Sequence, residues 1–153
     1  CIGCIAQQLP SSVEVIIRTP GPSFFIAQLI KKKIPILPLE YNNIDIIKSL
    51  HMALSGCPGG VAYGHYLQET QWLDDIRKLV GQDFGNFLLG NDDATNADIP
   101  RKLQGRGVRA IVGGGSICNI AQELGFPVFP VAVNRFTVQE TIHNALPIAD
   151  TQN

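Results

Sequence analysis

The sequence has little of what marks several common classes of protein. Charged residues make up only 16% of its 153 residues, the net charge is −1, and the one basic run is at 31–33. Without a basic stripe or a helix-turn-helix pattern, we expect no direct contact with nucleic acid. No window holds the roughly 18 uninterrupted apolar residues of a membrane span. The first residues also lack the basic flank of a signal peptide, so we expect no membrane association.

Cysteine is scarce and scattered, at Cys1, Cys4, Cys57 and Cys118. Cys1 and Cys4 form a CxxC pair, but no second pair or histidine cluster follows at the spacing of a zinc site. Scattered thiols suit the reducing cytoplasm, which is where we expect this protein. No nucleophile stands in a recognisable pattern with a base. We therefore expect no metal, no cofactor and no catalytic residues.

Strand-like and helix-like segments alternate along the chain. Strands are predicted over 13–18, 34–40, 61–66, 83–90, 108–113 and 126–131, and helices over 23–33, 43–54, 69–80, 96–104, 116–124 and 137–146. Asn96 is the expected N-cap of its helix, and Thr137 and Glu140 have the spacing of a capping box. This alternation predicts an α/β protein with parallel sheets between layers of helices.

An internal repeat organises the chain. The stretch "VEVIIRTPGPSFFIAQLIKKKIPILPL" (13–39) matches "VRAIVGGGSICNIAQELGFPVFPV" (108–131) in element order, and both end in a strand with proline at its second and fifth positions. The repeat indicates two similar α/β domains, over 1–55 and 61–148, with a Gly/Pro-rich break at 55–60. The last helix is a candidate to pack back on the first domain. Since the first domain shows two strands and the second four, we expect about two strand–helix units to precede Cys1.

Candidate ligand-binding residues lie in the loops that follow the strands, because ligands of such sheets bind at the carboxyl ends of strands. These residues are Arg18, Thr19, Gly21, Ser23, Asn42, Asn43, Gly64, His65, Gly114, Gly115, Ser116 and Asn134. The glycine loop before Ser116 could offer backbone N–H groups to an anion, or could be a turn that needs positive φ. Arg18 could pair with a carboxylate or be simply exposed. The asparagines and His65 could instead cap helices.

Two nucleotide-binding patterns do not fit the glycine loop. Cys118 stands where the third glycine of a dinucleotide fingerprint should be, and no acidic residue ends the next strand. The phosphate-loop pattern fails because no Gly-Lys-Ser/Thr occurs in the sequence. Cys118 itself would lie in the first turn of a helix, where a thiolate is favoured, although a buried structural thiol is the commoner outcome.

The stretches "VIIRTPGPSFFIAQLIKKKIPILPLEYNNIDIIKSL" (15–50) and "AIVGGGSICNIAQELGFPVFPV" (110–131) resemble a known family. The family is the N-terminal receptor (sensor) domain of the propionate-catabolism activator type, from sigma-54-dependent NtrC-family transcriptional regulators. The resemblance covers most of 11–148. It implies a duplicated, chelatase-like fold with two four-stranded parallel sheets, and a small, organic-acid ligand in an interdomain cleft. It also implies output ATPase and DNA-binding domains in the full-length chain, and a homo-oligomer.

One departure from the family lies in the first copy of the repeat. Where the family usually has Arg-Gly-Gly-Thr, this sequence has Thr19-Pro20-Gly21-Pro22, and the prolines lack the backbone N–H groups that an anion would use. Two other functions remain open, a two-domain enzyme (a racemase or a chelatase-like enzyme) and a solute-binding protein. A cofactor-independent amino-acid racemase would need two cysteines facing one cleft, and Cys57 and Cys118 are the internal pair.

Overall fold

The computed structural model describes residues 13, 15–18, 34–39, 41–66, 70–90 and 92–151. The chain forms two compact units. The first unit contains the described residues up to Tyr41 together with those from Val133 onward, and the second unit contains residues 42–132. The helix predicted over 23–33 and the Cys1–Cys4 pair lie outside the described residues.

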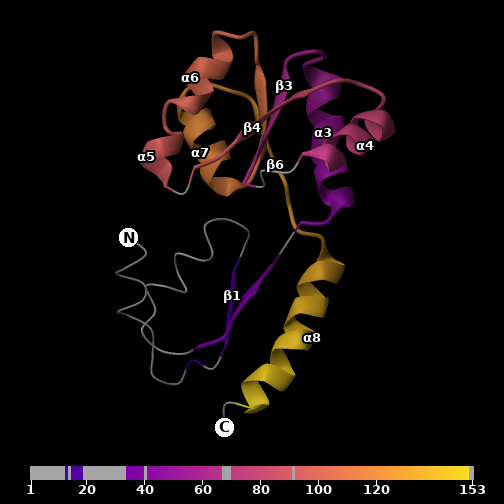
Figure 1. The fold of residues 1–153 in the computed structure, drawn as a ribbon, viewed down its shortest axis with the longest axis vertical. Coiled ribbons are helices and arrows are strands. Elements are labelled where there is room, and N and C mark those ends of the chain that lie inside the picture. The colour runs from indigo at the N-terminus through magenta and orange to yellow at the C-terminus, as the bar shows by residue number, and fades with distance from the viewer. Residues whose placement is uncertain are drawn as a thin grey trace. The chain divides into compact units, whose positions relative to one another are not determined.

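The second unit is a parallel sheet of four strands covered by helices on both faces. Its strands are β3 (Val61–His65), β4 (Gly85–Leu88), β5 (Ala110–Gly113) and β6 (Val128–Pro130), in the order β4-β3-β5-β6. Its helices are α3 (Asn43–Gly56), α4 (Gln71–Val80), α5 (Asp93–Asn96), α6 (Ile99–Gln104) and α7 (Gly115–Glu123). Helices α3 and α4 lie on one side of the sheet and α5, α6 and α7 on the other (Figure 1). The predicted three-layer α/β/α class with parallel strands is confirmed.

The core of the second unit forms around the two central strands. Every residue of β3 and β5 is buried, as expected for parallel strands covered on both faces. Leu50 of α3 packs against one face and is fully buried, while Ile117 and Ala121 of α7 lie in the cluster on the other face. The edge strand β4 is mostly exposed. Each helix thus covers the sheet with its apolar face.

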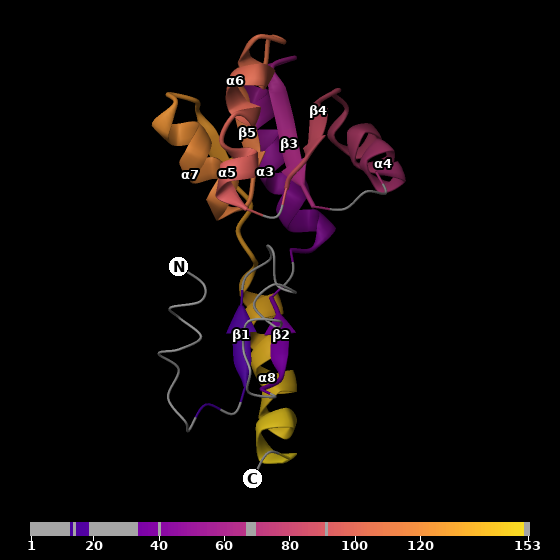
Figure 2. The ribbon, with the colours of Figure 1, turned by 60° about the vertical axis from the view of Figure 1, so that its left-hand side comes forward.

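The described part of the first unit consists of two parallel strands and a long helix. Strand β1 (Ile16–Arg18) pairs with β2 (Ile36–Pro38), with Ile16 opposite Ile36, and α8 (Arg135–Thr151) contacts β1 (Figure 2). Both strands are shorter than the predicted 13–18 and 34–40. Residues more than a hundred positions apart thus build one unit.

The two units do not coincide with the predicted domains, 1–55 and 61–148. Helix α3 packs on β3, β5 and β6 and belongs to the second unit, not to the first, whereas α8, the candidate to pack back on the first domain, lies in the first unit. The Gly/Pro-rich segment after α3 is a tight turn, in which the N–H of Gly60 donates to the carbonyl of Cys57 (3.1 Å) and leads directly into β3. The chain passes between the units after Tyr41 and after Ala132 instead. The Gly/Pro-rich composition at 57–60 thus corresponds to a turn within the second unit and not to a boundary between units.

Asn96 is not the N-cap that the sequence suggested. It ends the short helix α5, and its side chain is 2% exposed. Its Oδ1 accepts from the N–H of Gly90 (2.7 Å) and its Nδ2 donates to the carbonyl of Gly90 (3.1 Å). The cap of α5 is Asp92, whose carboxylate accepts from the N–H of Thr95 (2.6 Å), a bond that lowers the pKa of Asp92. Asn96 thus holds the segment after β4 in place through these two hydrogen bonds.

The capping box expected at Thr137 and Glu140 is also wrong. Helix α8 begins at Arg135, and Oδ1 of Asn134 accepts from the N–H of Thr137 (3.0 Å). Thr137 therefore lies inside the first turn, and its own carbonyl accepts from the hydroxyl of Thr141 (2.7 Å). The helix starts earlier because the side chain of Asn134 satisfies the N–H of Thr137 and so caps the first turn.

We expect Asn96→Ala to lower the free energy of unfolding by about 1–3 kcal/mol, because the two backbone groups of Gly90 lose their partner in a largely buried site. The measurement is urea unfolding followed by the fluorescence of Trp72. Asn119→Ala is the control, since Asn119 is exposed on α7 and its loss should cost less than about 0.5 kcal/mol. Equal stability of the two variants would contradict the role given to Asn96.

Candidate functional site

The carboxyl edge of the second unit's sheet brings together several of the predicted ligand-binding residues. Strand β3 ends with Gly64 and His65, and β5 ends with Gly113, which leads into Gly114, Gly115 and Ser116 of the glycine loop and α7. Helix α3 ends beside the start of β3 and runs antiparallel to it, so Asn42 and Asn43 lie at this same edge. Parallel pairing causes this grouping, since it sends all carboxyl ends to one side.

The glycine loop is not a turn that requires positive φ. The described glycines with positive φ are Gly59, Gly81, Gly107 and Gly125. Gly113 is needed for packing, because a Cβ there would lie 2.7 Å from Cγ2 of Ile117. Gly114 is the N-cap of α7 with extended backbone (φ −72°, ψ 176°) and offers no side-chain cap.

Gly115 has neither a conformational nor a packing reason to be glycine. A Cβ at this position would meet no atom within 4 Å. The first turn of α7 also carries no acidic residue. An N-terminal helical turn without a side-chain cap attracts anions through its N–H groups. The loop therefore leaves open space beside backbone groups that suit a negatively charged ligand.

His65 is held by a chain of polar contacts that begins on α4. Its ring is 5% exposed, stacks on Tyr63 (5.8 Å between centroids), and places Nε2 3.0 Å from Nδ2 of Asn86. The Oδ1 of Asn86 accepts from Nη2 of Arg77 (3.1 Å). A guanidinium only donates, so the amide must turn its oxygen toward Arg77 and its NH₂ toward His65. Nε2 of His65 is therefore an acceptor, and the ring hydrogen is on Nδ1.

Arg77 also ties α4 to the segment that enters β4. Its guanidinium donates to the carbonyl of Phe84 (3.0 and 3.2 Å) and to Asp74 (2.8 Å), lies 3.1 Å from Asp83, and stacks over the ring of Phe84 (4.8 Å). Sequence reasoning missed both Arg77 and Asn86. The one signal in the sequence is the three-residue spacing of Asp74 and Arg77, which is typical of a side-chain pair on a helix.

We expect ¹⁵N-edited NMR of the wild-type protein to show His65 with its hydrogen on Nδ1. In Asn86→Asp the new carboxylate accepts from Arg77 and also from the imidazole, so the hydrogen should move to Nε2. Asn119→Asp, on exposed α7, is the control and should leave the His65 signals unchanged. Finding Nε2 protonated in the wild type would contradict the orientation assigned to Asn86.

Two of the three predicted asparagines act as helix caps. Asn42 and Asp45 form a reciprocal capping box at the start of α3, with Oδ1 of Asn42 accepting from the N–H of Asp45 (2.9 Å) and the carboxylate accepting from the N–H of Asn42 (3.2 Å). Asn43 is the first residue of α3 and is exposed. Asn134 caps α8 in the first unit. These bonds account for Asn42 and Asn134 without a ligand.

Of the remaining predicted site residues, the structure describes the backbone of Arg18 and the whole of His65. Arg18 is the last residue of β1, and its side chain lies outside the described part of the structure. Thr19, Gly21 and Ser23 also lie outside the described residues. His65 caps no helix, because α4 begins at Gln71 with Thr70 before it.

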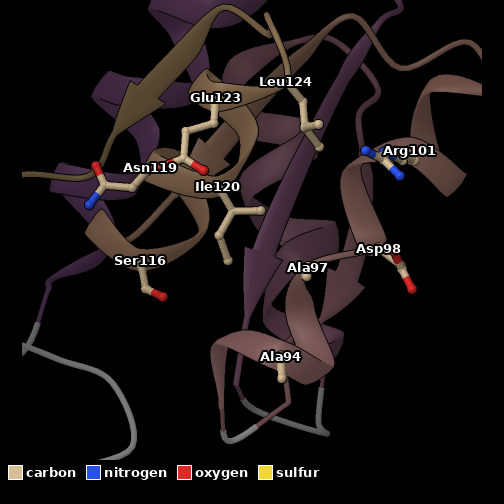
Figure 3. A pocket seen from close by; sticks show the side chains of 9 residues that line it. All are labelled: Ala94, Ala97, Asp98, Arg101, Ser116, Asn119, Ile120, Glu123 and Leu124. Atoms are coloured by element: carbon tan, nitrogen blue, oxygen red, sulfur yellow. The ribbon is translucent and has the colours of Figure 1, made fainter. Parts of the chain in front are cut away.

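An open groove of about 760 Å³ lies between α7 and the α5–α6 segment. Figure 3 shows Ser116, Asn119 and Glu123 along α7, across from Ala94 and the residues that follow it. The other lining residues are Ala97, Asp98, Arg101, Ile120 and Leu124. Of all these only Ser116 was predicted, because the facing segments are about 20 residues apart and share no motif. The groove has small apolar walls and a charged rim, and it begins beside the glycine loop.

Cys57 and Cys118 lie at opposite edges of the sheet. Cys57 ends α3 next to the start of β3, whereas Cys118 is in the first turn of α7 and directs Sγ to the carbonyl of Gly113 (3.5 Å). The pair does not face one site. Burial raises the pKa of Cys118 to about 11 and so disfavours the thiolate. Of the two interpretations of Cys118, the structure supports the buried structural thiol.

We expect iodoacetamide at pH 8 to alkylate half-exposed Cys57 while Cys118 stays unmodified in the folded protein. A pKa of about 11 in place of 9.0 lowers the thiolate fraction of Cys118 about a hundredfold, and burial hinders access as well. Peptide mass spectrometry reads each site separately. In urea both cysteines should react, and equal native rates would contradict the burial of Cys118.

Among the described residues, no group of three or more histidine, cysteine, aspartate or glutamate side chains is placed to hold a metal ion. Nor is any described helix long and apolar enough to cross a membrane.

Comparison with solved structures gives a similarity in fold. No protein-family model matches the sequence, and no curated protein matches it. Among solved structures, the chain resembles the crystal structure of an NtrC family transcriptional regulator from Clostridium acetobutylicum, with a TM-score of 0.85 and 19% identity. The match covers 99% of this chain and 79% of that one. The two proteins share a fold over almost the whole of this chain.

Proposed function

We propose that this chain is the ligand-sensing regulatory domain of an NtrC-family, sigma-54-dependent transcriptional activator. The observation that carries the proposal is the shared fold with a transcriptional regulator over 99% of the chain, at a TM-score of 0.85. The sequence resemblance of 15–50 and 110–131 points to the same class of regulator on separate grounds. It also narrows the proposal to the propionate-catabolism type.

The ligand in this proposal is a small organic acid that binds in a cleft between the two units. Support in the second unit comes from the glycine loop, where backbone N–H groups at the start of α7 suit a carboxylate and Gly115 leaves space beside them. In the first unit, the sequence adds Arg18, Thr19, Gly21 and Ser23 as candidate ligand residues, with a guanidinium for a carboxylate. The prolines among these residues leave the stretch fewer backbone donors than the family pattern has.

Ligand binding would favour one arrangement of the units over another and pass that preference to attached ATPase and DNA-binding domains. The domain itself carries out no chemistry in this proposal and contacts no nucleic acid. We place it in the cytoplasm, as part of a homo-oligomer. The racemase alternative loses its main support, since Cys57 and Cys118 do not face one site.

Isothermal titration calorimetry against short mono-, di- and tricarboxylates tests the proposal. We expect at least one carboxylate to bind the wild type, and Gly115→Val to weaken its affinity about tenfold or more by filling the open space, a change of about 1.4 kcal/mol. Gly56→Val is the matched control, because Gly56 also has no atom within 4 Å of a Cβ but lies at the opposite edge, at the end of α3.

Gly115→Val and Gly56→Val should unfold at the same urea concentration as the wild type within the effect of about 0.5 kcal/mol that surface substitutions have. The proposal of a site at the glycine loop is lost if no carboxylate binds, or if Gly115→Val binds as tightly as Gly56→Val.

A further inference from the structure

The groove between α7 and the α5–α6 segment has two walls with the same spacing of residues. Besides Leu124, the lining residues of α7 are at positions 116, 119, 120 and 123, and those of the facing wall are at 94, 97, 98 and 101. Both sets follow the i, i+3, i+4, i+7 spacing of residues on one face of a helix. All of them belong to the second unit, so the groove is complete within that unit.

The middle of the groove is lined by small or apolar side chains. Ala94 and Ala97 on the facing wall are exposed, and Ile120 of α7 is half-buried. How closely two helices approach depends on the side chains at their contact, and alanine allows a close approach. The open space of about 760 Å³ is therefore shaped to receive a helix.

Opposite charges lie across one end of the groove. Figure 3 shows Arg101 and Glu123 on opposite walls, at the end where Leu124 lies. Among the described residues the ion pairs are those of Arg77, so neither of these two charges has an ion pair there. Glu123 ends α7, where the helix dipole disfavours an anion, and the last turn of α7 has no basic residue. A cation supplied from outside the unit therefore stabilises Glu123.

The third charged residue of the groove has a favourable place within its own helix. Asp98 is the N-cap residue of α6, and the N-terminus of a helix favours a carboxylate. A two-fold axis across the groove would pair Asp98 with Arg101 of a second copy and leave Glu123 beside Ser116. An axis along the groove instead pairs Arg101 with Glu123 twice, because the two residues lie at the same level of the two walls.

We propose that two copies of this chain pair through the groove, with α7 of each copy lying in the groove of the other and a two-fold axis along it. Arg101 of each copy then meets Glu123 of the other, and Ile120 packs over Ala97. A two-fold interface must be complementary to itself, and a groove with one basic and one acidic wall meets that requirement. This pairing specifies the homo-oligomer of the proposed function and needs no carboxylate ligand.

Sedimentation velocity of the whole chain at low salt, from micromolar to millimolar concentration, tests the pairing. We expect the wild type to dimerise reversibly, and we expect Arg101→Glu or Glu123→Arg to weaken dimerisation about tenfold or more, because like charges then face each other twice. Lys102→Glu is the matched control. Lys102 is exposed beside Arg101 on α6 but does not line the groove, so this variant should dimerise as the wild type does.

An equimolar mixture of the Arg101→Glu chain and the Glu123→Arg chain gives the sharpest result. In a mixed dimer each acidic side chain at these positions again meets a basic one. The mixture should therefore recover the dimerisation that each variant lacks alone. An ion pair within one chain cannot produce this recovery, since neither chain carries both native charges. The axis across the groove does not produce it either, because Arg101→Glu would still face Asp98.

Several results would overturn the pairing. They are a wild type that stays monomeric throughout, a dimer that Arg101→Glu leaves unchanged, and a mixture that does not recover. Circular dichroism and the melting temperature of each variant should match the wild type, since Arg101 and Glu123 are exposed. Loss of pairing is thereby distinguished from loss of the fold.

The pairing and the proposed ligand site can fail separately. A protein that dimerises through the groove but binds no carboxylate in the calorimeter supports the pairing and counts against the ligand proposal alone. A monomer that binds a carboxylate at the glycine loop has the reverse meaning.

Discussion

The parallel pairing of β3 with β5 is the constraint on which the second unit depends. Both strands are buried on both faces, so helices must cover each side, and each connection must return the chain to the opposite edge. All carboxyl ends then meet at one edge. The glycine loop and the start of α3 lie there for this reason, and Cys57 lies away from it for the same reason.

Polar side chains hold the exposed edge strand β4 in place through hydrogen bonds. Arg77 donates to the carbonyl of Phe84, just before β4, and Asn96 accepts from the N–H of Gly90, shortly after it. Asn86, whose amide is oriented by Arg77, in turn orients His65 at the carboxyl end of β3. An edge strand with few buried apolar groups is thereby held by hydrogen bonds, and a ring at the candidate site is set in one tautomer.

Each unit is built from both copies of the repeat, because the copies exchange their last helices. Each copy of the repeat provides strands to one unit and its following helix to the other, so the units are linked twice at equivalent positions.

The order and type of the elements could be predicted from the sequence, because hydrophobic periodicity and Gly/Pro breaks act among neighbouring residues. The repeat, the parallel α/β class and the position of the glycine loop followed from these local patterns. The tertiary structure alone decided that α3 belongs to the second unit, that Asn96 holds Gly90, and that Asn86 orients His65. It also decided that Cys118 is buried, which raises the pKa of its thiol. These features depend on contacts such as that of Ser49 with Pro130, whose partners are brought together only by packing and leave no pattern along the chain.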